Sequence, residues 1–168
     1  MTLPDVDYHN EKYAVVALGH YLLEVEGWSS VLVVVALESL DRPGGVRGKP
    51  LPTIDAERDR TELYYAANFY TDTGGVDLVA TKPWQLLLIE AKGKSAKAPV
   101  GMEQLVGRTV LSMRTDRADR RHAILIPDLA PWLRAVGAAE NPMLAEIGVY
   151  AISPTGAIRR LKWGAASA

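Results

Sequence analysis

The chain has 168 residues and contains no cysteine. This absence excludes a disulfide framework, a thiolate zinc site and a cysteine nucleophile. Only three histidines are present, His9, His20 and His122, and they are scattered without the spacing of metal ligands. Each is therefore interpreted as a surface or packed histidine rather than a catalytic one.

Long hydrophobic runs are also missing. The longest apolar stretch, Val31 to Leu37, is far shorter than the ~20 residues that a membrane span needs, so no span is expected. The first seven residues are acidic and lack the features of a secretory signal, which leaves a cytoplasmic location as the expectation. The glycine-rich segment Arg42 to Pro50 lacks phosphate-loop spacing, which argues against a nucleotide-hydrolysing motor.

The charge of the chain is unevenly distributed, although the net charge is only −1. Residues 82–121 hold nine Lys or Arg against four Asp or Glu. A basic segment of this kind suits a phosphate-bearing substrate. For Arg114 to Arg121, a solvated helix end and loop is an equally good interpretation.

In the first half of the sequence, a helix is predicted over 11–26, with Asn10 as its cap and Gly27 as its stop. Val31 to Leu37 is β-branched and uninterrupted, as in a strand buried on both faces. The Gly- and Pro-rich residues 41–55 predict a long loop that could reach a ligand. Residues 57–70 fit either a helix or a strand, with aromatics that suit core packing better than base stacking.

In the second half, apolar residues between Met102 and Met113 recur at helical spacing. A strand at 123–127, a helix at 131–139 and a strand at 148–152 follow, and a turn at 153–156 leads into 157–161. Helices and strands alternate, which predicts one α/β domain over 1–168, a sandwich of helices around a central mixed β-sheet.

Two carboxylates and an ammonium group stand near the end of one predicted strand. Because strand side chains alternate between faces, Glu90 and Lys92 share a face and Ala91 points the other way. A hairpin through Lys82-Pro83-Trp84 could bring Asp77 beside Glu90. Two carboxylates and the Ala91 carbonyl are hard oxygen ligands that suit Mg²⁺. The competing interpretation is an exposed strand end with a surface ion pair.

Two polar residues of the following helix lie off its apolar stripe. Gln104 and Arg108 are four positions apart and so share a helix face. They could point an amide and a guanidinium group toward the end of the strand that carries Glu90.

Asp77, Glu90-Ala91-Lys92 and Gln104 together resemble the D…ExK…Q signature of the PD-(D/E)xK phosphodiesterase superfamily, which has the restriction-endonuclease-like fold. The order of predicted elements from Glu11 to Ile126 also resembles that superfamily, most closely its Mrr-like and Holliday-junction-resolvase-like branches. A weaker similarity is to the element excision controlling factors of the same fold. The chain departs from the pattern at Gly75-Val76, where a proline could be sought before the first acid.

The resemblance implies a three-layer sandwich and metal-dependent hydrolysis of DNA phosphodiester bonds in repair, restriction or mobile-element processing. Asp77, Glu90 and the Ala91 carbonyl would hold Mg²⁺ or Mn²⁺. Lys92 and Gln104 would position water and substrate. Lys94, Lys97 and Arg108 would hold the flanking phosphates.

The resemblance also implies an acid on the first helix, either Glu11 or Glu24. These lie about 220° apart around a helix of ~3.6 residues per turn, so only one can face the site, and Glu11 is preferred. The alternative function is a DNA-binding or regulatory protein, such as an excision or assembly factor, that keeps the fold without cleaving. A homodimer and a separate protein partner remain further expectations.

Overall fold

The computed structural model describes residues 6–35, 63–67, 70–71, 74–113 and 118–165. The elements follow in the order α1 (Glu11–Glu24), β1 (Ser30–Val35), β2 (Leu63–Ala67), β3 (Tyr70–Thr71), β4 (Gly74–Gly75), β5 (Leu78–Lys82), β6 (Gln85–Ala91), α4 (Ala98–Ser112), β7 (Arg120–Pro127), α5 (Ala130–Gly137), the 3₁₀ helix η2 (Pro142–Glu146), β8 (Ile147–Ile152) and β9 (Ile158–Leu161). None of the helices in these ranges is long and apolar enough to cross a membrane.

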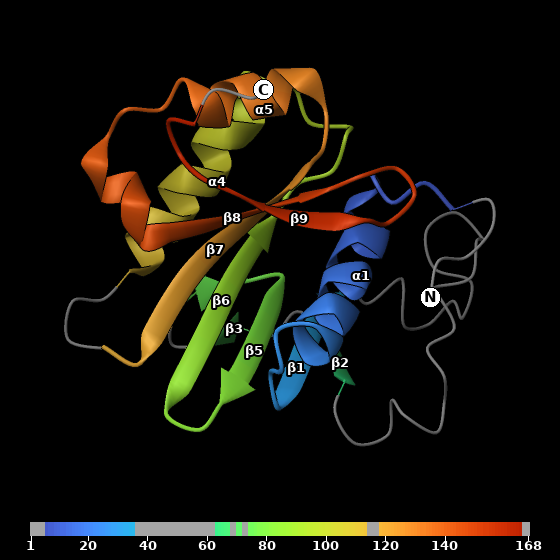
Figure 1. Ribbon diagram of the computed structural model, residues 1–168. Helices are drawn as coiled ribbons and strands as arrows, with labels where there is room; N and C mark the ends of the chain where they lie inside the picture. The colour runs from blue at the N-terminus through green and yellow to red at the C-terminus, as the bar shows by residue number, and fades with distance from the viewer. Residues whose placement is uncertain (1–5, 36–62, 68–69, 72–73, 114–117, 166–168) are drawn as a thin grey trace.

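A mixed sheet forms the centre of the fold, as the sequence predicted. Its strand order is β2-β1-β5-β6-β7-β8-β9, with parallel pairs β1–β2, β6–β7 and β7–β8 and antiparallel pairs elsewhere. Helix α1 packs on β1, β5 and β6 on one face, while α4 and α5 lie together on the other face (Figure 1). The α/β class is therefore confirmed, with one apolar core on each side of the sheet.

Helix α1 begins where its cap predicts. The Asn10 side chain accepts a hydrogen bond from the Lys12 backbone N–H at 3.3 Å. The helix ends at Glu24, two residues before the predicted end, and Gly27 follows with φ of +65°. Only glycine adopts this left-handed conformation without strain, so Gly27 turns the chain toward β1.

Strand β1 lies inside the sheet, between β2 and β5. Val31 and Val33 are fully buried, in agreement with a strand covered by a helix. The sequence left helix and strand open for residues 57–70, and the described residues 63–67 and 70–71 form strands. Residues 36–37, the predicted loop at 41–55, residues 57–62 and residues 68–69 lie outside the described residues.

Helix α4 starts at Ala98, four residues before the predicted start at Met102. Pro99 occupies the first turn, where its missing N–H costs nothing. Strand β7 likewise starts at Arg120 rather than Ala123, because Arg120 to His122 pair with Leu86 to Leu88 of β6. The helix predicted at 131–139 forms over Ala130–Gly137, and the last two strands match within one residue.

Candidate metal and phosphate site

The β5–β6 hairpin brings Asp77 beside Glu90. Pro83 and Trp84 form its turn, with Trp84 at φ of +63°, and the register pairs Leu78 with Ile89. Next to this pair, the Asp77 N–H donates to the Ile89 carbonyl at 3.0 Å. The Ala91 N–H in turn donates to Asp77 Oδ2 at 2.7 Å, so a carboxylate continues the strand ladder.

Glu90 is a buried acid, with only 4% of its surface exposed. Burial, followed by the nearby Asp77 carboxylate, raises the pKa of Glu90 to about 7. Burial also raises the pKa of Asp77, against the hydrogen bond from Ala91, which lowers it. Arg108 of α4 places Nη1 3.8 Å from Glu90 Oε2, but its side chain is largely exposed. The ends of the two interior strands β5 and β6 therefore hold two acids whose negative charges are only partly compensated.

Lys92 stands beside these acids. Its Nζ donates to the Ala91 carbonyl at 3.1 Å and lies 3.7 Å from Glu11 Oε2. Its backbone N–H donates to the Leu125 carbonyl at 3.0 Å, which ties this residue to β7. The ammonium group is thus held in place by groups from β6 and α1.

Glu11, rather than Glu24, lies at this site. Besides its contact with Lys92, its Oε2 accepts the Gly93 N–H at 3.3 Å. Glu24 instead lies 3.7 Å from His20, one helical turn back. The contact with Gly93 needs glycine, because a Cβ there would stand 2.7 Å from the Glu11 nitrogen. The sequence reasoning did not identify Gly93, since one glycine after a strand carries no distinctive signal.

Asp7 and His9 also border the site, and sequence reasoning assigned neither to it. The Lys94 N–H donates to the His9 carbonyl at 2.8 Å, and the Lys94 ammonium pairs with Asp7 Oδ2. His9 is buried, as a packed histidine would be, and its Nε2 has no hydrogen-bond partner among the described residues. Lys94, expected to contact phosphate, therefore already neutralises an acid of its own chain.

Three of the predicted site residues lie on α4 or at its N-cap, all within the described ranges, and only Arg108 contacts one of the two acids. Arg108 reaches Glu90, as given above. Gln104 is exposed on the same helix, and in the described part of the chain its amide makes no hydrogen bond. Lys97 is the exposed N-cap residue of α4. The structure thus groups Asp77, Glu90, Lys92, Glu11 and Arg108, while Gln104 and Lys97 lie on the adjoining surface.

Carboxylate and carbonyl oxygens at the ends of β5 and β6 are of the kind that binds a hard divalent cation. Asp77 Oδ2 takes a backbone hydrogen bond and the Ala91 carbonyl accepts one from Lys92 Nζ, so Asp77 Oδ1 and the Glu90 carboxylate would be the first oxygens to reach such an ion. No group of three or more His, Cys, Asp or Glu side chains within the described ranges is arranged to hold a metal. Two carboxylates with a carbonyl and waters nevertheless suffice for Mg²⁺.

Scans of this chain against protein-family models, curated proteins and solved structures found no match. The function of the chain is therefore inferred from the geometry of the site itself.

Proposed function

We propose that this chain is a divalent-metal-dependent nuclease that hydrolyses DNA phosphodiester bonds. The observation that carries the proposal is the pair Asp77 and Glu90. These two acids lie side by side where the interior strands β5 and β6 meet the loops, with Lys92 next to them. Burying two acids together is unfavourable unless a cation or proton compensates them. A catalytic metal site accounts for an arrangement that a purely structural strand end does not need.

Each residue has a part in this proposal. Asp77, Glu90 and the Ala91 carbonyl would hold Mg²⁺ or Mn²⁺, which when bound polarises the scissile phosphate and lowers the pKa of a water molecule. Lys92, kept in position by Glu11, orients the attacking water and offsets negative charge that develops on the phosphate. Arg108, Gln104 and Lys97 would contact the flanking phosphates.

We also propose that the chain has the restriction-endonuclease-like fold. The order of α1, β1, the β5–β6 hairpin, α4 and β7 is the order that the sequence resemblance implies, and it supports this assignment. Helices on both faces of a mixed sheet agree with the implied three layers. A dimer would bring two such sites to the two strands of a duplex.

One observation favours the alternative function, a DNA-binding or regulatory protein that does not cleave. Lys92 lies beside Glu11 and Arg108 beside Glu90, so the charges of the site are partly balanced by the chain's own cations. A site of this kind can remain folded without any metal.

Calorimetric titration with Mn²⁺ and nicking of supercoiled DNA distinguish the two functions. We expect a Mn²⁺ site in the intact chain that is lost in Asp77→Asn, and Mn²⁺-dependent nicking that falls at least about 100-fold in Glu90→Gln and in Lys92→Gln.

Asp128→Asn is the matched control, because the Asp128 carboxylate pairs with Arg159 of β9 and not with a residue of this site. It should bind Mn²⁺ and nick DNA as the intact chain does. Nicking that survives all three site substitutions would disprove the assignment of the active site. DNA binding without Mn²⁺ binding or nicking would establish the alternative.

A further inference from the structure

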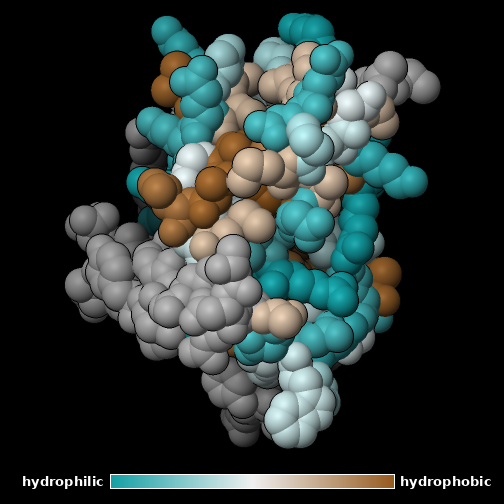
Figure 2. All heavy atoms as spheres, turned by 90° about the vertical axis from the view of Figure 1, so that its left-hand side faces the viewer, coloured by the Kyte–Doolittle hydropathy of each residue, from teal (hydrophilic) through white to brown (hydrophobic). Residues whose placement is uncertain are grey.

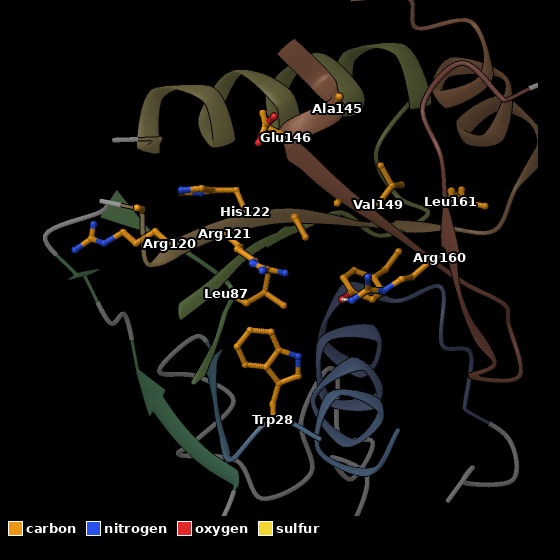
Figure 3. Close-up of a pocket in the computed structure, with 14 residues that line it drawn as sticks. Trp28, Leu87, Arg120, Arg121, His122, Ala145, Glu146, Val149, Arg160 and Leu161 are labelled. Carbon is orange, nitrogen blue, oxygen red and sulfur yellow. Dashed lines mark hydrogen bonds between the residues drawn. The ribbon is translucent and has the colours of Figure 1, made fainter. Parts of the chain in front are cut away.

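A second site lies at the opposite end of β6 and β7 from the two acids. A cavity of about 480 Å³ opens there on the face of the sheet that α1 covers (Figure 3). Leu87 and Arg121 line it near the beginnings of these strands, whereas Glu90 lies near the end of β6. Tyr150 and Arg160 line it from β8 and β9, and Trp28 from the segment after α1.

The hollow has a simple cause in the sequence. Helix α1 ends at Glu24, and among the described residues no other helix continues over this face of the sheet. The floor there consists of Ala123 and Gly148, which are paired across β7 and β8. A Cβ on Gly148 would lie 3.3 Å from Ala123 Cβ, so even one added methyl group would crowd the floor. The small side chains of the floor and the end of α1 at Glu24 together leave space for a ligand.

Two arginines of the wall differ in how they are held. Arg160 donates from Nε and Nη2 to the two Glu26 carboxylate oxygens at 2.7 and 2.6 Å, and Nη2 also lies 2.9 Å from Tyr150 Oη. Arg121 is exposed and forms no ion pair with any residue that the structure describes. It extends from β7 above Leu87 toward Arg160 (Figure 3). The Arg160 guanidinium is thus held by Glu26 and Tyr150, whereas Arg121 has no such ion pair in the part of the chain that the structure describes.

The remaining lining combines charge with apolar surface. Arg120 also lines the cavity, and Glu146 is the acid among the lining residues. Trp28 and Leu87 supply apolar walls. The view from the left-hand side of Figure 1 shows hydrophilic side chains spread around an apolar patch (Figure 2).

We infer that this cavity binds a phosphate monoester with an apolar or aromatic body, of the size of a nucleoside monophosphate. Arginine forks match phosphate oxygens, and Arg121 forms no ion pair within the described ranges that would compete for its fork. The cavity is far larger than a lone phosphate needs and falls in the range of small-ligand sites. The inference does not depend on the proposed nuclease activity, because the two sites share no residue.

Calorimetry on the full chain with dAMP, deoxyadenosine and inorganic phosphate tests this inference. We expect saturable binding of dAMP, and binding at least about tenfold weaker for each of the other two, since each lacks one half of the ligand. Arg121→Gln should weaken dAMP binding at least about tenfold, and Arg121→Lys by less, because it keeps the charge and loses the fork.

Three controls make the result decisive. Arg134→Gln, an exposed arginine of α5 outside the cavity, should bind dAMP normally, and so should Asp77→Asn, which separates this site from the nuclease proposal. Ala145→Phe, at the exposed rim, should block the cavity without entering the core. Absence of dAMP binding, or dAMP binding unchanged in Arg121→Gln and Ala145→Phe, would overturn the inference. Tight binding of a 5′-phosphorylated oligonucleotide without dAMP binding would assign the cavity to a nucleic-acid end instead of a free nucleotide.

Discussion

At the scale of single residues, Glu90 is the most informative position. Its pKa of about 7 means that the folded chain binds a proton at this carboxyl where the unfolded chain, with a pKa near 4.5, does not. Between these two pH values the folded state therefore holds more protons, and this group's contribution to stability decreases as the pH rises. The contribution of Glu90 to the free energy of unfolding is therefore at its highest below about pH 4.5 and at its lowest above about pH 7.

Glu90→Gln should therefore stabilise the apo chain at alkaline pH. Urea unfolding at pH 8 is expected to give a free energy of unfolding higher than that of the intact chain by up to about 3 kcal/mol. At pH 4 the two should differ much less, because Glu90 is then protonated in the native state. Equal stabilities of the two chains at pH 8 would show that the buried charge is already compensated without a metal.

At the scale of elements, the packing of α4 on α5 depends on a glycine. A Cβ on Gly101 would lie 2.4 Å from Cη2 of Trp132, a buried side chain of the second core. Gly107, on the same helix, has nothing within 4 Å of its would-be Cβ. One helix thus offers two glycines with opposite expected responses to alanine.

Gly101→Ala should lower the free energy of unfolding by about 1–3 kcal/mol, because the overpacked methyl group displaces Trp132. Gly107→Ala should raise it by about 0.5–1 kcal/mol through helix propensity alone. Thermal or urea unfolding of both variants measures the difference. Stabilisation by both substitutions would mean that α4 and α5 are further apart than described.

A second link between elements joins the end of α1 to the last hairpin. The Glu26 carboxylate accepts hydrogen bonds from Arg160, Tyr150 and Trp28. Burial alone would raise the pKa of Glu26, but these hydrogen bonds, led by that from Arg160, hold it below its ordinary value. The stabilisation is present above the ordinary pKa and is lost as the pH falls through the lower, folded value.

Glu26→Gln should destabilise the chain at pH 7 by about 1–3 kcal/mol, since a charged hydrogen-bonded acceptor is replaced by an amide. The difference should shrink in acid, where Glu26 itself becomes protonated. Asp128→Asn, which loses a pair to the exposed Arg159, should change stability by less than about 1 kcal/mol. Urea titrations at pH 7 and pH 3 provide the measurement.

At the scale of the whole molecule, the basic segment 82–121 does not form one uniform patch. Lys94 is neutralised by Asp7, and Arg108 lies beside Glu90, whereas Arg121 lines the separate cavity. Lys97 is exposed at the start of α4, next to the proposed site. Contact with a DNA backbone should therefore depend on fewer cations than the composition indicates.

Lys97→Gln should weaken DNA binding by a similar factor for all DNA sequences. It should also reduce the slope of log K against log salt concentration by about 1. Lys162→Gln, an exposed lysine after β9, should leave both quantities unchanged. Fluorescence anisotropy with labelled duplexes over a range of salt concentrations gives the slopes. Identical slopes for both variants would remove Lys97 from the DNA-binding surface.

Local patterns in the sequence predicted most of the described elements and the juxtaposition of Asp77 with Glu90. The alternation of side chains and one Lys-Pro turn were enough to predict the β5–β6 hairpin. Local patterns did not reveal the roles of Gly93 and Asp7 or the partners of Glu26, because those contacts join segments far apart in the chain. Strand pairing also extended β7 to Arg120, which propensity alone does not predict. Long-range packing, which a periodicity cannot encode, accounts for these differences.

The link between Glu26 and Arg160 also bears on synthesis of the chain. The two residues are 134 positions apart, so a ribosome that adds roughly 5–20 residues per second needs on the order of 10 s between them. During that interval α1 can form, but Glu26, two residues after the helix, lacks the guanidinium that it meets in the native state. The apolar surface around Trp28 stays open for the same time, so a nascent chain halted before Arg160 should be a better chaperone substrate than one extended past it.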